Sequence, residues 1–131
     1  AGEKNSVKFY DDSKGTNVGS VIRALDTFAQ PVILLLGGRD KDGDFETLKP
    51  LLATKIKKVI LFGEAQNRIA SLIGENVPVL KKLKLREAIE IAYKDSQPGD
   101  IILLSPGCAS FDEFTDYKER GDFFKKVVRD L

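Results

Sequence analysis

The sequence predicts an α/β domain built on an open, mostly parallel sheet of about five to six strands, with helices on both faces. Two observations lead to this fold class. Short apolar runs alternate along the 131-residue chain with segments whose apolar residues recur at helical spacing. One of these runs, PVILLL (31–36), is apolar on both faces, as central parallel strands are when helices cover both sides of a sheet. No linker or repeat divides the chain, so residues 1–131 are expected to form one domain.

The elements of the first half follow from their apolar positions. VKFY (7–10) is the first predicted strand, and Asn17 can cap the helix that follows it. PVILLL (31–36) is typical of a central strand, and Asp44 can then cap a short helix. The residues of these two helices expected to face the core are Val18, Val21, Leu25 and Phe28, then Phe45, Leu48 and Leu52.

The second half continues the alternation. KVILF (58–62) is the next strand, and the helix after it should stop near Gly74. VPVL (77–80) is a short strand whose proline favours a sheet edge, and IILLS (101–105) is the last strand. The helices of this half are marked by Ala65, Ile69 and Leu72, by Leu85, Ala88, Ile89 and Ala92, and by Phe123, Phe124, Val127 and Leu131. The order of strands and helices favours a Rossmann-like sheet.

Composition excludes several function classes. The chain has no histidine, which excludes Ser-His-Asp triads and histidine metal sites. Its single cysteine, Cys108, excludes an internal disulfide and suits a reducing compartment. The 21 basic and 20 acidic residues nearly cancel, so nothing favours nucleic acid or an anionic membrane as a partner. No apolar stretch approaches the roughly 18 residues of a membrane span, so we expect no membrane partner. The single cysteine leads us to expect a cytoplasmic location, and we expect a monomer. Methionine is absent even at position 1, which leads us to expect a piece of a longer protein.

Three unusual loops follow predicted strands. They are DDSKGTN (11–17), GGRDKDGDF (37–45) and SPGCASF (105–111). Open α/β sheets bind ligands outside the carboxyl ends of their strands. We therefore expect all three loops to lie on one rim of the sheet.

The first loop combines acids, a lysine and a helix start. Lys14 could reach a phosphate as a point charge, and Asp12 could accept hydrogen bonds from ribose hydroxyls. Thr16 and Asn17 offer polar side chains at a helix N-terminus, where backbone N–H groups favour anions. A capped turn with solvated charges explains the same residues, and the loop alone leaves both interpretations open.

In the second loop, Gly37 and Gly38 permit a sharp turn or a close approach to a ligand, and Lys41 stands among acidic residues. A Gly-Gly turn with mixed surface charge is the alternative. Its aspartates superficially resemble a calcium loop, but the glutamate spacing of an EF-hand is missing. The P-loop pattern G-x-x-x-x-G-K-[ST] occurs nowhere in the chain, so we expect no triphosphate cradle in this domain.

The third loop leaves a predicted strand through small residues. Ser110, with Glu113 three residues later, fits a capping box, and a helix N-terminus there would accept a carboxylate or phosphate. Cys108 is interpreted as a small packed residue, because the chain has no histidine to activate its thiol.

Together and in this order, the three segments resemble the C-terminal domain of the Mur ligases. DDSKGTN is similar to that family's D-S-K-A-T-N, with Gly15 in place of Ala. LLLGGRDKDGDF (34–45) is similar to its G-G-x-x-K-x-x-D-F loop. GDIILLSPGCASFDEFTDYKERGDFF (99–124) is similar to its G-D-x-x-L-L-S-P-A-C-A-S segment and the E-R-G-x-x-F that follows, with Gly107 in place of Ala. The resemblance covers almost the whole chain, and the serine and lysine of the first segment favour the branch that adds D-glutamate.

The resemblance implies ATP-dependent amide formation in peptidoglycan precursor synthesis. The terminal carboxylate of UDP-N-acetylmuramoyl-L-alanine would be phosphorylated, and the amine of D-glutamate would attack the acyl phosphate through a tetrahedral intermediate. In the family, an N-terminal domain holds the UDP moiety, and a central domain carries the P-loop, the Mg²⁺ ligands and a carbamylated lysine. This chain would be the third domain alone, without a catalytic residue or metal site of its own, and inactive by itself.

Carried over residue by residue, the resemblance implies two sets of binding residues. Asp12 would meet the ATP ribose and Lys14 a phosphate. The D-glutamate site would consist of Thr16, Lys41, Ser110, Phe111 and Tyr117. Phe111 stands where leucine is common in the family, and both aromatic residues would act partly through backbone N–H groups. An amino acid with two carboxylates needs cations and N–H donors, which Lys41 and the Ser110 segment would supply.

Two alternatives belong to other classes. The first is a standalone regulatory domain that binds a nucleotide or phosphate at the same rim. The second is a small flavodoxin-like or receiver domain, although a receiver needs a phospho-acceptor aspartate where LLLGG (34–38) ends in glycines. A preceding region with G-K-T followed by acidic metal ligands would decide for the ligase.

Overall fold

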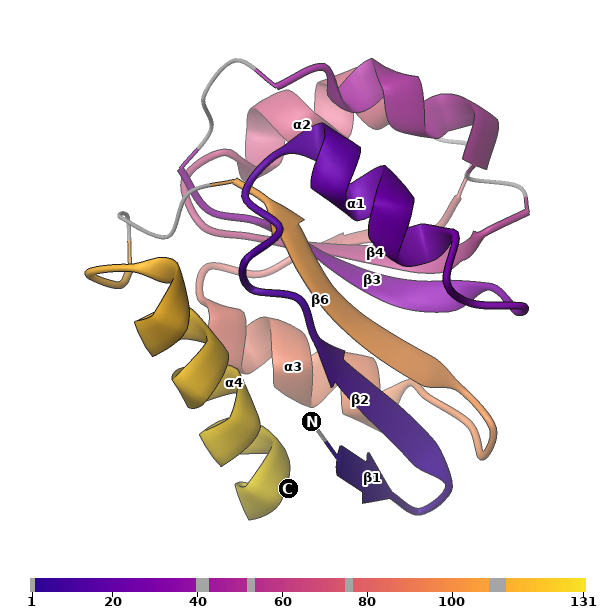
Figure 1. Cartoon of the computed structure of the whole chain (residues 1–131), viewed down its shortest axis with the longest axis vertical. Coiled ribbons are helices and arrows are strands. Elements are labelled where there is room, and N and C mark those ends of the chain that lie inside the picture. The colour runs from indigo at the N-terminus through magenta and orange to yellow at the C-terminus, as the bar shows by residue number, and fades with distance from the viewer. Residues whose placement is uncertain (1, 40–42, 52–53, 75–76, 109–112) are drawn as a thin grey trace.

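The computed structural model describes residues 2–39, 43–51, 54–74, 77–108 and 113–131 (Figure 1). Within these ranges, six strands form one sheet in the order β1-β2-β6-β3-β4-β5. All neighbouring pairs are parallel except β1 with β2. The strands are β1 (Gly2–Lys4), β2 (Val7–Asp11), β3 (Val32–Gly37), β4 (Ile56–Phe62), β5 (Val79–Lys81) and β6 (Ile101–Gly107). The predicted fold class is confirmed.

Helices cover both faces of this sheet, as predicted. One layer consists of α1, the 3-10 helix η1 and α2, and the other of α3 and α4 (Figure 1). Their bounds are α1 (Val18–Leu25), η1 (Phe45–Leu51), α2 (Gln66–Ile73), α3 (Leu85–Lys94) and α4 (Tyr117–Asp130). In the described ranges, no helix has the length and apolar character to cross a membrane.

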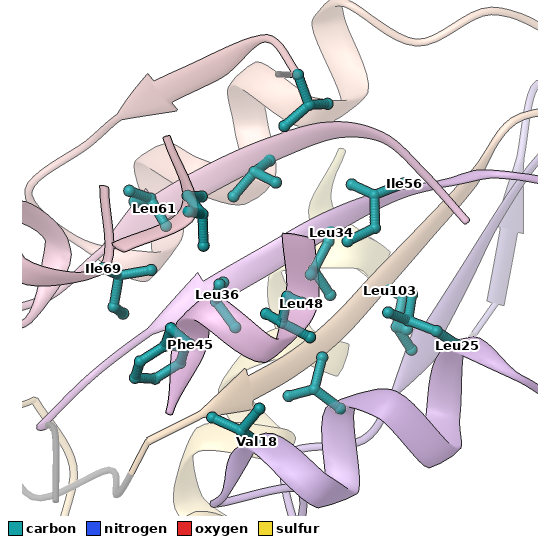
Figure 2. Close-up of a cluster of buried hydrophobic side chains, with 14 of the residues drawn as sticks. Val18, Leu25, Leu34, Leu36, Phe45, Leu48, Ile56, Leu61, Ile69 and Leu103 are labelled. Carbon is teal, nitrogen blue, oxygen red and sulfur yellow. The ribbon is translucent and has the colours of Figure 1, made fainter. Parts of the chain in front are cut away.

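The core has two halves because successive strand residues point to opposite faces. In β3, Leu34 and Leu36 pack under α1, η1 and α2, whereas Ile33 and Leu35 pack under α3 and α4. Figure 2 shows the first half, with Leu36 among side chains of α1 and η1. All of β3 is buried, which is the pattern predicted for a central parallel strand.

Local signals account for several boundaries. Helix α1 begins after Asn17, whose side-chain oxygen accepts a hydrogen bond from the Ser20 N–H at 2.9 Å. Helix α2 ends before Gly74, which has a φ of +74°. Strand β5, directly after Pro78, lies at the sheet edge. These three features agree with the sequence predictions.

Three elements differ from those predicted. Strand β1 was not expected; it pairs antiparallel with β2 through a hairpin in which Asn5 and Ser6 adopt positive φ. The helix after Asp44 is a 3-10 helix that contains Pro50, and Leu52 lies outside the described residues. Helix α4 begins at Tyr117, later than a start behind the third loop would place it. It is capped by Asp116, whose carboxylate accepts from the Glu119 N–H at 2.8 Å.

Candidate functional site

The three loops arise from neighbouring strands. Strands β2, β6 and β3 are adjacent and parallel, so their carboxyl ends lie side by side (Figure 1). Residues 12–17, called the first loop below, follow β2, and the second and third loops follow β3 and β6. The sheet order therefore confirms that the described parts of these loops share one rim.

The first loop packs directly on the end of β6. The Asp12 N–H donates to the Leu104 carbonyl at 2.7 Å, and the Gly107 N–H donates to the Gly15 carbonyl at 2.8 Å. A Cβ atom at Gly15 would lie 2.5 Å from Oδ2 of Asp12 and 3.0 Å from Oγ of Ser105. A side chain at position 15 would therefore require the Asp12 carboxylate to shift.

The Asp12 carboxylate has a defined orientation. The hydroxyl of Ser105, a completely buried residue of β6, donates to Oδ2 of Asp12 at 2.8 Å. Among the described residues, no hydrogen bond reaches the other carboxylate oxygen, Oδ1. Asp12 is half-buried and therefore presents a fixed acceptor at the surface.

Two open clefts meet at Asp12 and Lys14. One, of about 350 Å³, lies between the first loop and α1 and includes Arg23. The other, of about 450 Å³, lies between the first loop and α4 and includes Tyr117 and Lys125. Both clefts thus combine a carboxylate acceptor with lysine or arginine cations, which suits a ligand that carries hydroxyl and anionic groups.

A buried arginine ties the first loop to β6 and α4. Arg120, on α4, has no exposed surface. Its Nε donates to Oγ of Ser13 at 2.9 Å, its Nη2 to the Ser13 carbonyl at 2.8 Å, and its Nη1 to the Cys108 carbonyl at 3.0 Å. The Ser13 hydroxyl donates in turn to the Tyr117 carbonyl at 2.7 Å. A buried charge is costly unless it is hydrogen-bonded, and here those bonds join three segments of the rim.

Comparison with known proteins agrees with this architecture. Residues 1–108 match the family described as Mur ligase, glutamate ligase domain. The chain belongs to the Mur ligase family. This confirms the resemblance seen in the loop motifs.

Curated relatives of this Mur ligase domain are named UDP-N-acetylmuramoylalanine–D-glutamate ligase. The protein of that name from Syntrophus aciditrophicus (strain SB) is 61% identical over 97% of this chain and 28% of the relative. The one from Bdellovibrio bacteriovorus is 49% identical over 94% of this chain and 27% of the relative. The one from Chlamydia caviae is 45% identical over 99% of this chain and 31% of the relative. The chain therefore spans less than a third of the length of these curated relatives.

The structure of the Mur ligase domain describes four of the seven predicted site residues. Asp12, Lys14 and Tyr117 line the cleft beside α4. Thr16 is half-buried, and its N–H donates to the Lys14 carbonyl at 2.8 Å. Tyr117 is the first residue of α4, so its N–H has no acceptor within the helix. The other three lie outside the described residues: Lys41, Ser110 and Phe111.

The described part of the second loop serves packing. A Cβ atom at Gly37 would lie 2.0 Å from the Phe62 carbonyl oxygen, so the close approach that this glycine permits is to β4. Arg39 forms a solvent-exposed ion pair with Glu64 at 3.0 Å. These contacts fit the Gly-Gly turn with surface charge, and the predicted role of Lys41 stays a prediction.

The third loop is anchored on its C-terminal side as well. The Glu113 carboxylate accepts a hydrogen bond from the Leu85 N–H at 3.1 Å, at the start of α3. The capping box predicted between Glu113 and Ser110 lies partly outside the described residues. Cys108 and Glu113 therefore each accept a hydrogen bond from a helix on the same face of the sheet.

Sequence reasoning missed Ser105 and Arg120 as supports of the rim. A weak signal existed for each. Ser105 is a polar residue in a strand that is otherwise apolar, and Arg120 lies four residues before Phe124, on the inward face of α4. Neither signal identifies the partner.

Proposed function

We propose that this Mur ligase domain is the amino-acid-binding part of an ATP-dependent ligase. The whole protein would add D-glutamate to UDP-N-acetylmuramoyl-L-alanine through an acyl phosphate, in peptidoglycan precursor synthesis. The observation that carries this proposal is the identity of 45–61% to D-glutamate ligases over nearly all of the chain. The rim motifs of the first and third loops lie within the aligned region.

The first loop supports a nucleotide role. Asp12 offers a carboxylate whose orientation is set by Ser105, and Lys14 is exposed at the junction of the two clefts. A carboxylate can accept hydrogen bonds from ribose hydroxyls, and an ammonium group can pair with a phosphate. We therefore assign Asp12 to the ribose and Lys14 to a phosphate of ATP.

The D-glutamate site would lie beside this loop. We assign it to Thr16, Lys41, Ser110, Phe111 and Tyr117. The support is spatial for two of them, because Thr16 belongs to the first loop and the Tyr117 carbonyl accepts from Ser13 of the same loop. The α4 N-terminus beside Tyr117 favours a carboxylate through its N–H groups and dipole.

ATP and Mg²⁺ are the cofactors that we infer for the whole protein. The residues of this chain contain no P-loop pattern, so the groups that stabilise phosphoryl transfer would come from elsewhere in that protein. This chain would position the amino acid and the outer part of the nucleotide. A cytoplasmic location follows from the same proposal and fits the single cysteine.

The test is ligation by the full-length protein. We expect ADP release that requires both UDP-N-acetylmuramoyl-L-alanine and D-glutamate, with L-glutamate and D-aspartate as matched amino acid controls. Asp12→Ala should raise the KM for ATP and leave the KM for D-glutamate unchanged. ADP release that ignores the amino acid, or binding of nucleotide with no product, would favour a regulatory nucleotide-binding domain instead.

A further inference from the structure

Both the backbone and the side chain of Asp12 are held by consecutive residues of β6. The Asp12 N–H donates to the Leu104 carbonyl at 2.7 Å, and the Asp12 carboxylate accepts from the Ser105 hydroxyl at 2.8 Å. Strand β6 is itself hydrogen-bonded on both sides, to β2 and β3. The orientation of the Asp12 carboxylate is therefore defined by the centre of the sheet rather than by the loop.

The hydrogen bond of Ser105 differs from those of Ser13, which is also buried, and of the half-buried Ser96. The hydroxyl of Ser13 donates to the backbone carbonyl of Tyr117, and that of Ser96 donates to the backbone carbonyl of Tyr93. Ser105 instead donates to a carboxylate 93 residues away in sequence. Satisfying a buried hydroxyl does not require such a partner.

Space for this arrangement is provided by Gly15. Any side chain there would meet Oδ2 of Asp12 and Oγ of Ser105, at 2.5 Å and 3.0 Å from its Cβ atom. With Oδ2 bound to Ser105, the carboxylate is restricted in rotation, and Oδ1 has no hydrogen bond among the described residues. A preorganised acceptor loses less conformational entropy when a ligand binds.

We propose that Ser105 is a positioning residue that orients the Asp12 carboxylate toward the ribose hydroxyls of the nucleotide. Ser105 thereby sets the preference for a ribonucleotide over a sugar that lacks those hydroxyls. This inference rests on the proposed function, in which Asp12 contacts the ribose. It assigns a role to a buried residue that does not itself touch the nucleotide.

The test compares ATP with 2′,3′-dideoxy-ATP in the full-length protein. Ser105→Ala should raise the KM for ATP by about five- to tenfold, since orientation of a charged acceptor is lost. Dideoxy-ATP has no 2′ or 3′ hydroxyl that could donate a hydrogen bond to Asp12, so its KM should change by less than about twofold. The KM for D-glutamate should stay unchanged. Ser96→Ala is the matched control, because it also removes a serine hydroxyl donor but lies beyond the C-terminal end of α3.

A double-mutant cycle tests whether Ser105 acts through Asp12. In the Asp12→Ala background, Ser105→Ala should produce no further change in the KM for ATP. Thermal unfolding verifies that each variant is folded, and Ser105→Cys, which keeps a small side chain with a weaker donor, replaces Ser105→Ala if the latter does not fold.

The inference would be overturned if Ser105→Ala raised the KM for ATP and the KM for dideoxy-ATP by the same factor. It would also be overturned if Ser105→Ala raised the KM for ATP as much in the Asp12→Ala background as in the wild type. Either result would show that Ser105 has only a packing role. If Asp12→Ala itself left the discrimination between the two nucleotides intact, the ribose assignment and the inference would both be wrong. If the protein bound nucleotides but did not ligate D-glutamate, only the proposed reaction would be wrong. Equilibrium titrations with ATP and dideoxy-ATP would then test the role of Ser105 through the same comparison of affinities.

Discussion

Arg120 is the residue whose placement best explains how the rim is held together. Its guanidinium group is completely buried and donates to acceptors on the first loop and at the end of β6. A planar fork of donors can serve several fixed acceptors at once, which a lysine ammonium on a flexible stem cannot do in the same way. The site therefore depends on the shape of this side chain as well as on its charge.

Replacing Arg120 by methionine should lower the free energy of unfolding by about 2–4 kcal/mol, because buried carbonyl acceptors would lose their donors. Urea unfolding of the chain measures this. Arg129→Met, on the exposed face of the same helix, is the matched control and should change stability by less than about 0.5 kcal/mol. Similar losses for both variants would show that the buried hydrogen bonds contribute little.

We expect Lys41 to contribute to the binding of D-glutamate and not to the binding of ATP. In the full-length protein, Lys41→Ala should raise the KM for D-glutamate by about 10- to 100-fold, through loss of a charge-assisted contact worth about 1.5–3 kcal/mol. The KM for ATP should change little. Lys49→Ala, which removes an exposed lysine of η1, serves as the control in the same kinetic assay. An unchanged KM for D-glutamate would remove Lys41 from the site.

At the scale of elements, the approach of α4 to the first loop decides the shape of the second cleft. Gly121 of α4 faces the end of β2 and this loop, and a Cβ atom there would lie 2.8 Å from Oδ2 of Asp11 and 3.3 Å from Cβ of Ser13. Glycine is a poor helix former, so its presence inside α4 needs a reason. Close packing of helix on loop supplies it.

Two glycine-to-alanine substitutions show whether close packing or helix propensity has the larger effect on stability at Gly121. Gly121→Ala should lower the free energy of unfolding, because the added methyl group would clash with its neighbours. In an exposed helix the same substitution would stabilise the helix by about 1 kcal/mol. Gly19→Ala, in α1, meets its nearest atoms at 3.4 Å and should be neutral or stabilising. Thermal unfolding of both variants gives the comparison. A stabilised Gly121→Ala protein would mean that α4 can move away from the loop at little cost.

At the scale of the whole molecule, the described part of the rim joins segments that are far apart in the sequence. The first loop, the end of β6 and the start of α4 form one hydrogen-bonded unit. The chain contains neither a P-loop pattern nor a histidine. The phosphoryl transfer that we propose for the whole protein would therefore need groups from outside this sequence, and the proposed role of this chain is binding and orientation.

We therefore expect the isolated chain to fold and to show neither ATP hydrolysis nor ligation. Release of ADP from ATP, with and without D-glutamate, measures both activities. The full-length protein at the same concentration is the positive control. Hydrolysis that follows the chain through size-exclusion chromatography would contradict this prediction and the division of roles behind it.

The sequence alone determined most of the elements and predicted that helices cover both faces of the sheet. Apolar runs identified β3, β4 and β6, the side chain of Asn17 identified the start of α1, and Pro78 placed β5 at an edge. These features depend on residues close together in the chain, so local periodicity and capping chemistry reveal them. The three loops were also placed on one rim, because each follows a predicted parallel strand.

Only the tertiary structure decided which strands are neighbours and which side chains support the site. Strand β6, the last in the sequence, lies between β2 and β3. This order brings Ser105 to Asp12 across 93 residues and Arg120 to Ser13 across 107 residues. Local sequence patterns indicate that a residue is buried but do not identify its hydrogen-bond partner, because that partner depends on how the whole sheet is assembled. The motifs thus predict the binding residues, which stays a prediction, whereas their buried hydrogen-bond partners are found only in the fold.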